Sequence, residues 1–160
     1  MNDAGRDKTK GSLVCATRGG AGSRAVQEKA IAYAQESKRS LIFLYVVDTS
    51  NVNDIEESLH SALQEELYWM GSALLNIAHK RAETRRINSK IVIREGQVMD
   101  EICSFLEEEA ADLLLIGAPR GTTSTSFGDD PIERFAESIE KESGVRVEVV
   151  RPESAAGETV

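Results

Sequence analysis

The stretch Leu41-Ile42-Phe43-Leu44-Tyr45-Val46-Val47 decides the fold class, because it is an unbroken apolar run rich in β-forming residues. A strand with one solvated face alternates polar and apolar residues, whereas a continuous apolar run is typical of a parallel strand covered on both faces. Residues 13–16 and 113–116 are shorter runs of the same kind. The three runs therefore predict the central strands of one parallel sheet.

Stretches of helical period separate these runs. Three of them lie at residues 23–34, 54–86 and 98–110. A fourth begins at Pro131, where Asp130 and Glu133 are spaced as in a helix capping box. Residues 90–94 and 145–150 read as two further strands. The second alternates valine with charged residues, which predicts an edge strand. Alternating strands and helices predict an α/β fold, a parallel sheet with helices on both faces.

The helical pattern at residues 54–86 is unusually long. Unbroken, it would extend about 50 Å at 1.5 Å per residue. That length is large for a domain of this size, so we expect a break near Gly71 or a frayed start.

The composition is that of an ordinary globular protein. The chain has 160 residues, 41% hydrophobic and 29% charged, and a net charge of −8. We expect one domain over residues 12–151, with disordered ends at 1–11 and 152–160. The acidic balance argues against nucleic-acid binding, and no apolar run is long enough for a membrane helix. We also expect no signal peptide and a cytoplasmic location. The chain has two cysteines, which form neither a disulfide framework nor a zinc-ligand pattern.

The loop after residues 113–116 is the first candidate for binding. In such sheets ligands bind beyond the carboxyl ends of the strands, at the point where the strand order reverses. Residues 117–128 are rich in glycine and hydroxyl side chains and include Arg120, which together suit an anion. The alternative is a flexible surface loop, and the spacing matches neither a Walker loop nor the dinucleotide fingerprint.

Two segments resemble the universal stress protein family. Arg94-Glu95-Gly96-Gln97-Val98, continuing to Ile102, is similar to that family's exit from the third strand, and residues 111–117 are similar to its fourth strand and first loop glycine. The resemblance covers roughly residues 11–152. It implies a five-stranded parallel sheet in the order 3-2-1-4-5, a homodimer that pairs edge strands, and a role in stress tolerance.

One branch of this family binds ATP, and its motif maps poorly onto this chain. The family's acidic residue after the first strand falls on Arg18, and the second loop glycine, Gly121, comes one residue late. The Gly-Ser pair expected before the last helix falls near Glu133. The candidate nucleotide or anion contacts are Thr17, Arg18, Val47, Gly117, Arg120, Gly121, Thr122, Thr123 and Ser124.

The charges near the last helix favour the branch of the family that does not bind ATP. Asp129, Asp130 and Glu133 crowd the start of the last helix, where the resemblance would seat phosphates. We therefore expect a non-enzymatic stress-response or regulatory domain without ordinary ATP binding and without a cofactor. The alternative is an adenine-nucleotide sensor or slow ATPase with an altered loop, taking ATP or AMP, with Mg²⁺ if the ligand is a triphosphate.

No catalytic or metal-binding constellation stands out in the sequence. His60 and His79 are too far apart to ligate one metal, and we expect both to be solvated. We expect Cys15 and Cys103 to be buried, inert thiols. We expect a homodimer through Val145, Val147 and Val149, and a protein partner of unknown identity. Two clusters stay open: Tyr68, Trp69 and Met70 as core or interface, and Lys80, Arg81, Arg85 and Arg86 as a helix end or a partner patch.

Overall fold

A computed structural model describes residues 11–17, 21–49, 56–118 and 131–152. The ends predicted to be disordered lie, apart from Gly11 and Pro152, outside these ranges. The described elements alternate strictly between strand and helix. They are β1 (Ser12–Ala16), α1 (Ala21–Ser37), β2 (Leu41–Val47), α2 (Glu57–Thr84), β3 (Ser89–Glu95), α3 (Val98–Glu108), β4 (Ala111–Gly117), α4 (Pro131–Ser143) and β5 (Arg146–Val150).

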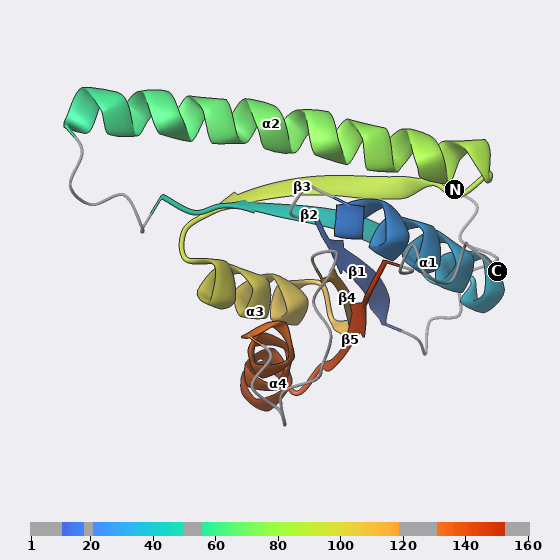
Figure 1. Cartoon of the computed structure of the whole chain (residues 1–160). Helices are drawn as coiled ribbons and strands as arrows, with labels where there is room; N and C mark the ends of the chain where they lie inside the picture. Colours follow the sequence, from blue (N-terminus) through green and yellow to red (C-terminus); the bar gives the residue numbers. More distant parts are fainter. Residues whose placement is uncertain (1–10, 18–20, 50–55, 119–130, 153–160) are drawn as a thin grey trace, which may run out of the picture.

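The strands form one parallel sheet in the order β3-β2-β1-β4-β5 (Figure 1). Leu13 of β1 pairs with Leu41 of β2 on one side and with Leu113 of β4 on the other. The three continuous apolar runs are therefore the three inner strands, as predicted. The predicted fold class and strand order are both confirmed.

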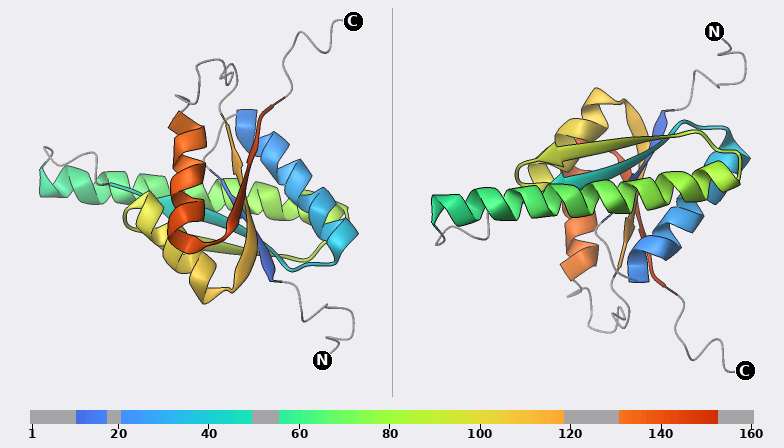
Figure 2. Two further views of the ribbon diagram at one scale, coloured as in Figure 1. Left: turned by 90° about the horizontal axis from the view of Figure 1, so that it is seen from below. Right: turned by 90° about the horizontal axis from the view of Figure 1, so that it is seen from above.

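Each face of the sheet has its own hydrophobic core. Leu13, Cys15 and Phe43 point to one face, where α1 and α2 cover them. Val14, Ile42 and Leu44 point to the other face, beneath α3 and α4. Figure 2 shows the two helix pairs on opposite sides of the strands. This two-sided burial explains why β1, β2 and β4 carry no polar alternation.

The long helix α2 is continuous from Glu57 to Thr84, so the predicted break near Gly71 is wrong. Gly71 is buried where α2 crosses β2. A Cβ atom there would lie 2.9 Å from Cγ of the Tyr45 ring and closer still to two other ring atoms. The glycine therefore allows the helix to approach the sheet and does not end it.

Gly71→Ala should destabilise the protein even though alanine is the better helix former. Overpacking a tight contact costs about 1–3 kcal/mol, which exceeds the gain of about 1 kcal/mol in helix propensity. Urea unfolding followed by far-UV circular dichroism measures the change. In a Tyr45→Leu background the same substitution should cost little, and an equal cost in both backgrounds would contradict the proposed contact.

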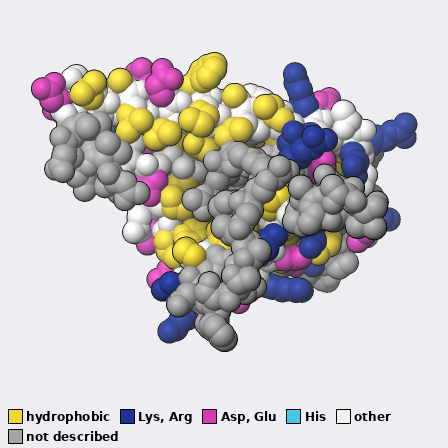
Figure 3. Space-filling view, in the orientation of Figure 1, with side chains coloured by type: hydrophobic (Ala, Val, Ile, Leu, Met, Phe, Trp, Pro, Cys, Tyr) yellow, Lys and Arg dark blue, Asp and Glu magenta, His cyan; other side chains and the backbone are white. Residues whose placement is uncertain are grey.

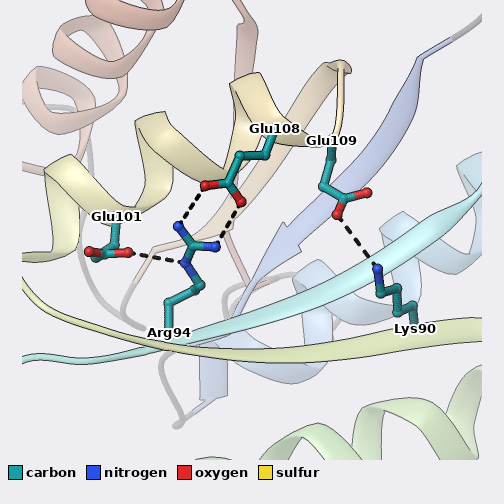
Figure 4. Close-up of polar contacts among 5 residues, drawn as sticks. All are labelled: Lys90, Arg94, Glu101, Glu108 and Glu109. Atoms are coloured by element: carbon teal, nitrogen blue, oxygen red, sulfur yellow. Dashed lines mark hydrogen bonds and ion pairs between the residues drawn. The ribbon is translucent and has the colours of Figure 1, made fainter.

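An ion-pair cluster fastens α3 onto β3. The Arg94 guanidinium donates to both carboxylate oxygens of Glu108, at 2.8 and 3.0 Å, and to Glu101 at 3.1 Å. Lys90 pairs with Glu109 at 3.5 Å (Figure 4). A two-oxygen contact of this kind fixes orientation as well as charge. It places α3 against an edge strand whose backbone is otherwise open to solvent.

The hydrogen bond from Arg94 lowers the pKa of Glu108. Because its folded-state pKa lies below the unfolded one, the pair stabilises the protein at neutral pH, and the contribution disappears as pH falls through the folded-state pKa. Arg94→Met should raise the pKa of Glu108 toward its ordinary value in an NMR titration. Lys90→Met is the control, and an unchanged Glu108 titration in Arg94→Met would refute the pairing.

Candidate functional site

The strand order reverses between β1 and β4, which are neighbours in the sheet. From β1 the chain proceeds outward to β2 and β3, then returns to β4 and continues to β5. The helices α1 and α4, which follow β1 and β4, begin at the carboxyl ends of these strands. Helix N-termini carry partial positive charge. This end of the sheet is therefore the place where the fold would hold an anionic ligand.

Thr17 is the best-placed of the predicted contact residues. It follows β1 directly, is 3% exposed, and its backbone N–H donates to the carbonyl of Leu44 at 2.8 Å. Its Oγ1 atom has no partner with full hydrogen-bond geometry among the described residues, although it lies close enough to the Cys15 thiol to lower the pKa of that group. Buried hydroxyls are nearly always paired, so an unpaired one at a ligand-binding position is a signal for a polar group.

The end of β2 is occupied by structural bonds. Val47 is buried, and its carbonyl accepts the N–H of Gly96 at 3.0 Å, which extends the β2–β3 ladder. The next residue, Asp48, accepts the N–H of Val98 at 3.2 Å and so caps α3. The sequence gave no sign of this cap, because the two partners are fifty residues apart.

Gly117 ends β4 and is half-buried, at the predicted position beside β1. The N–H of Ala118 donates to the carbonyl of Val150 at 2.9 Å, which continues the ladder to β5. Several predicted residues lie outside the described part of the chain. They are Arg18, Arg120, Gly121, Thr122, Thr123, Ser124, Asp129 and Asp130.

The start of α4 carries an ion pair that the sequence analysis missed. The helix begins at Pro131, as predicted. Glu133 in its first turn accepts a hydrogen bond from Nη2 of Arg151 at 3.1 Å. Arg151 follows β5, so this pair ties the end of the edge strand to the helix start. The arginine offsets part of the negative charge that the acidic residues bring to this position.

Neither thiol is a plausible nucleophile. Cys15 is buried, as predicted, and burial raises its pKa to about 12. Cys103 was also predicted to be buried, which is wrong, because it is only half-buried, on α3 beside α4. Burial and the Glu142 carboxylate, whose Oε2 lies 3.6 Å from Sγ, raise its pKa. Both cysteines are thiols, and a nucleophile requires the thiolate.

His79 differs from the prediction of a solvated side chain. Its Nδ1 lies 2.8 Å from Oγ of Ser89, which is buried at the start of β3. The contact joins α2 to β3. Within the described residues, no group of three or more His, Cys, Asp or Glu side chains could hold a metal ion.

A hollow of about 480 Å³ lies at the opposite end of the sheet, where α3 and α4 end. Glu107 and Glu142 line it together with Leu106 and Val145. It lies at the amino ends of β4 and β5, so the length of the strands separates it from Thr17. Its carboxylates do not suit an anionic ligand.

The comparisons with known proteins agree with this geometry. Residues 11–151 match the universal stress protein family. Comparison with curated proteins gives no match. Among solved structures, UspA from Lactobacillus plantarum is 20% identical with a TM-score of 0.67, over 89% of this chain and 99% of that one. A family member from Burkholderia pseudomallei is 20% identical, with a TM-score of 0.64 over 89% and 96%.

A universal stress protein family member from Arabidopsis thaliana, solved with AMP bound, is 16% identical, with a TM-score of 0.62 over 93% of this chain and 95% of that one. Because the family match spans nearly the whole chain, this protein belongs to the universal stress protein family. None of the helices in the described ranges has the length and apolar character needed to cross a membrane.

The unpaired Thr17 hydroxyl leads to a stability prediction. Thr17→Val keeps the shape and removes a buried hydroxyl that makes no full hydrogen bond within the described residues, so the free energy of unfolding should stay the same or rise. Ser89→Ala is the control, because it removes a hydroxyl bonded to His79 and should cost about 1 kcal/mol. Denaturant unfolding measures both. A loss in Thr17→Val as large as in the control would show that the hydroxyl has a partner in the free protein.

Proposed function

We propose that this protein is a non-enzymatic regulatory domain of the universal stress type that does not bind ATP in the ordinary way. It acts through contacts with a second copy of the chain or with another protein, and it needs no cofactor. Both cysteines are free thiols, which agrees with a cytoplasmic, reducing environment.

The observation that carries this proposal is the carboxylate of Glu133 in the first turn of α4. A triphosphate seated on the amides of this turn would lie beside a fixed negative charge. Arg151 is bonded to that carboxylate and offsets it only in part. Asp129 and Asp130 precede the helix in sequence and add two more negative charges.

The two cysteines, both within the described residues, are not activated nucleophiles, which supports the non-enzymatic part of the proposal. Of the described residues, both cysteines have raised pKa values. The Ser89 hydroxyl does contact His79, but Ser89 is 8% exposed and no carboxylate in the described ranges hydrogen-bonds to that histidine. A buried serine at the amino end of a strand is out of reach of a substrate.

Isothermal titration calorimetry with MgATP tests the proposal. The unmodified protein should show no saturable binding at micromolar concentration. Glu133→Gln removes the carboxylate and should tighten any residual ATP binding by about tenfold, which corresponds to about 1.4 kcal/mol. Glu137→Gln, an exposed position one turn further along α4, should have no effect. Micromolar affinity in the unmodified protein would overturn the proposal.

A second candidate is an adenine-nucleotide sensor or slow ATPase. The buried hydroxyl of Thr17, which makes no full hydrogen bond to any residue that the structure describes, favours it, and the Arabidopsis thaliana relative was solved with AMP bound. A monophosphate brings less charge to the acidic helix start than ATP does. Arg18 and Arg120 are then the candidate phosphate partners, with Mg²⁺ needed only for a triphosphate. Binding of AMP without ATP would support this version, and ATP turnover would identify the slow ATPase.

The edge of β5 remains the predicted homodimer surface. Val147 and Val149 are half-buried against the hydrophobic core beneath α3 and α4, and Val145 immediately precedes the strand. An exposed edge needs covering. Part of it is covered already, since Oε1 of Glu140 accepts the N–H of Val147 at 2.8 Å. Pairing of two β5 strands would have to displace this carboxylate or leave that N–H outside the ladder.

A further inference from the structure

The helix α2 has a second apolar face that points away from the sheet. Its sheet-facing residues are Gly71, Leu75, Ala78 and Ala82, all in its second half. On other sides of the helix, large apolar side chains are exposed to solvent. They are Leu59, Tyr68, Trp69, Met70 and Ile77, with Trp69 the most exposed at 72%. The reading of Tyr68, Trp69 and Met70 as core is therefore wrong, and the interface reading stays open.

The spacing along this face is that of a helix that packs on another helix. We call Leu59, Leu63, Glu66, Met70, Ala73 and Ile77 the outer seam; they follow one another at intervals of four, three, four, three and four residues. This is the a/d spacing of a coiled coil. Single exposed apolar residues need no explanation, but five apolar residues in register, interrupted only by Glu66, mark an interaction surface.

Within the described part of the chain, the first half of α2 has little support, and Leu67 is its one apolar residue packed against the core. None of the described helix residues before Gly71 is buried. Figures 1 and 2 show this half extending beyond the end of β3. A helical segment of this length is marginally stable in water by itself. A second helix packed against the outer seam would supply the missing contacts.

The charges along α2 indicate what that second helix is. Residues 56–70 carry four glutamates and no lysine or arginine, whereas residues 80–86 carry four basic residues and one glutamate. Figure 3 shows acidic side chains at one end of α2, basic ones at the other and apolar ones between. Among the described residues these glutamates and basic side chains form no ion pair with one another. A copy of α2 running in the opposite direction is complementary to this pattern.

We propose that two copies of the chain associate through their outer seams, with the two α2 helices antiparallel about a two-fold axis near Met70 and Ala73. Such a contact is self-complementary. Glu66 then lies near the partner subunit's Lys80, and the aliphatic stem of that lysine covers Leu63. The surface is separate from the β5 edge, because α2 packs on β2 and β3 at the other side of the sheet.

Sedimentation equilibrium tests the contact. The unmodified protein should be at least a dimer at micromolar concentration, since pairing of the β5 edges as well would join such dimers into larger assemblies. Met70→Lys places two like charges at the axis and should raise the dissociation constant by about a hundredfold. Ser61→Lys is the matched control, an exposed α2 position off the seam that should leave the dimer intact. Circular dichroism checks that both variants are folded. A monomeric unmodified protein, or a dimer that Met70→Lys leaves unchanged, would overturn the proposal.

Disulfide trapping in a Cys103→Ser background tests the orientation. Ala73→Cys lies near the axis and should form a disulfide with the same residue of the second copy, whereas Leu59→Cys, at the far end of the outer seam, should not, because its two copies lie at opposite ends of the pair. Equal crosslinking of both would indicate parallel helices and overturn the antiparallel arrangement.

Charge exchange tests the complementarity. Glu65→Lys with Glu66→Lys, and separately Lys80→Glu with Arg85→Glu, should each weaken self-association. A mixture of the two double variants should form a heterodimer, since one α2 is then basic and the other acidic along the seam. Failure of the mixture to associate would contradict the proposed pairing of charges.

Discussion

The burial of β1, β2 and β4 on both faces is the constraint on which the other features depend. Apolar side chains point to both sides of these strands, so helices must cover both sides. Parallel strands joined by helices then leave β3 and β5 at the edges, and the strand order must reverse between β1 and β4. The position of any ligand site, and of both exposed edges, follows from this arrangement before any particular polar residue is considered.

The fold could be predicted from the sequence because the patterns that indicate its strands and helices are local. Continuous apolar runs identified the inner strands, and Pro131 marked the start of α4. The prediction of a break at Gly71 was wrong because the sequence does not show the Tyr45 ring that lies against this glycine. The cap of α3 by Asp48 and the Glu133–Arg151 pair also escaped prediction, because each joins residues brought together only by folding.

The position of the candidate site could be predicted from the sequence, but the hydrogen bonds made by its residues could not. The loop ends at Thr17 and Gly117 lie together at the reversal point, as expected, but the Val47 carbonyl is engaged with Gly96. Family membership establishes the fold and a stress-response setting. We place the function of this chain on contact surfaces, because a carboxylate stands at the helix turn where a phosphate would rest and a long helix exposes an apolar seam.

The most direct measurement is a nitrogen–proton NMR titration of the protein with MgATP, with the backbone amides of Thr17, Ile132 and Glu133 assigned. These amides report on the two sides of the reversal point. If the acidic helix start excludes a triphosphate, their shifts should stay constant through micromolar ATP. Saturable shifts of Ile132 and Glu133 at micromolar ATP would show that the phosphates rest on this turn and would contradict the account.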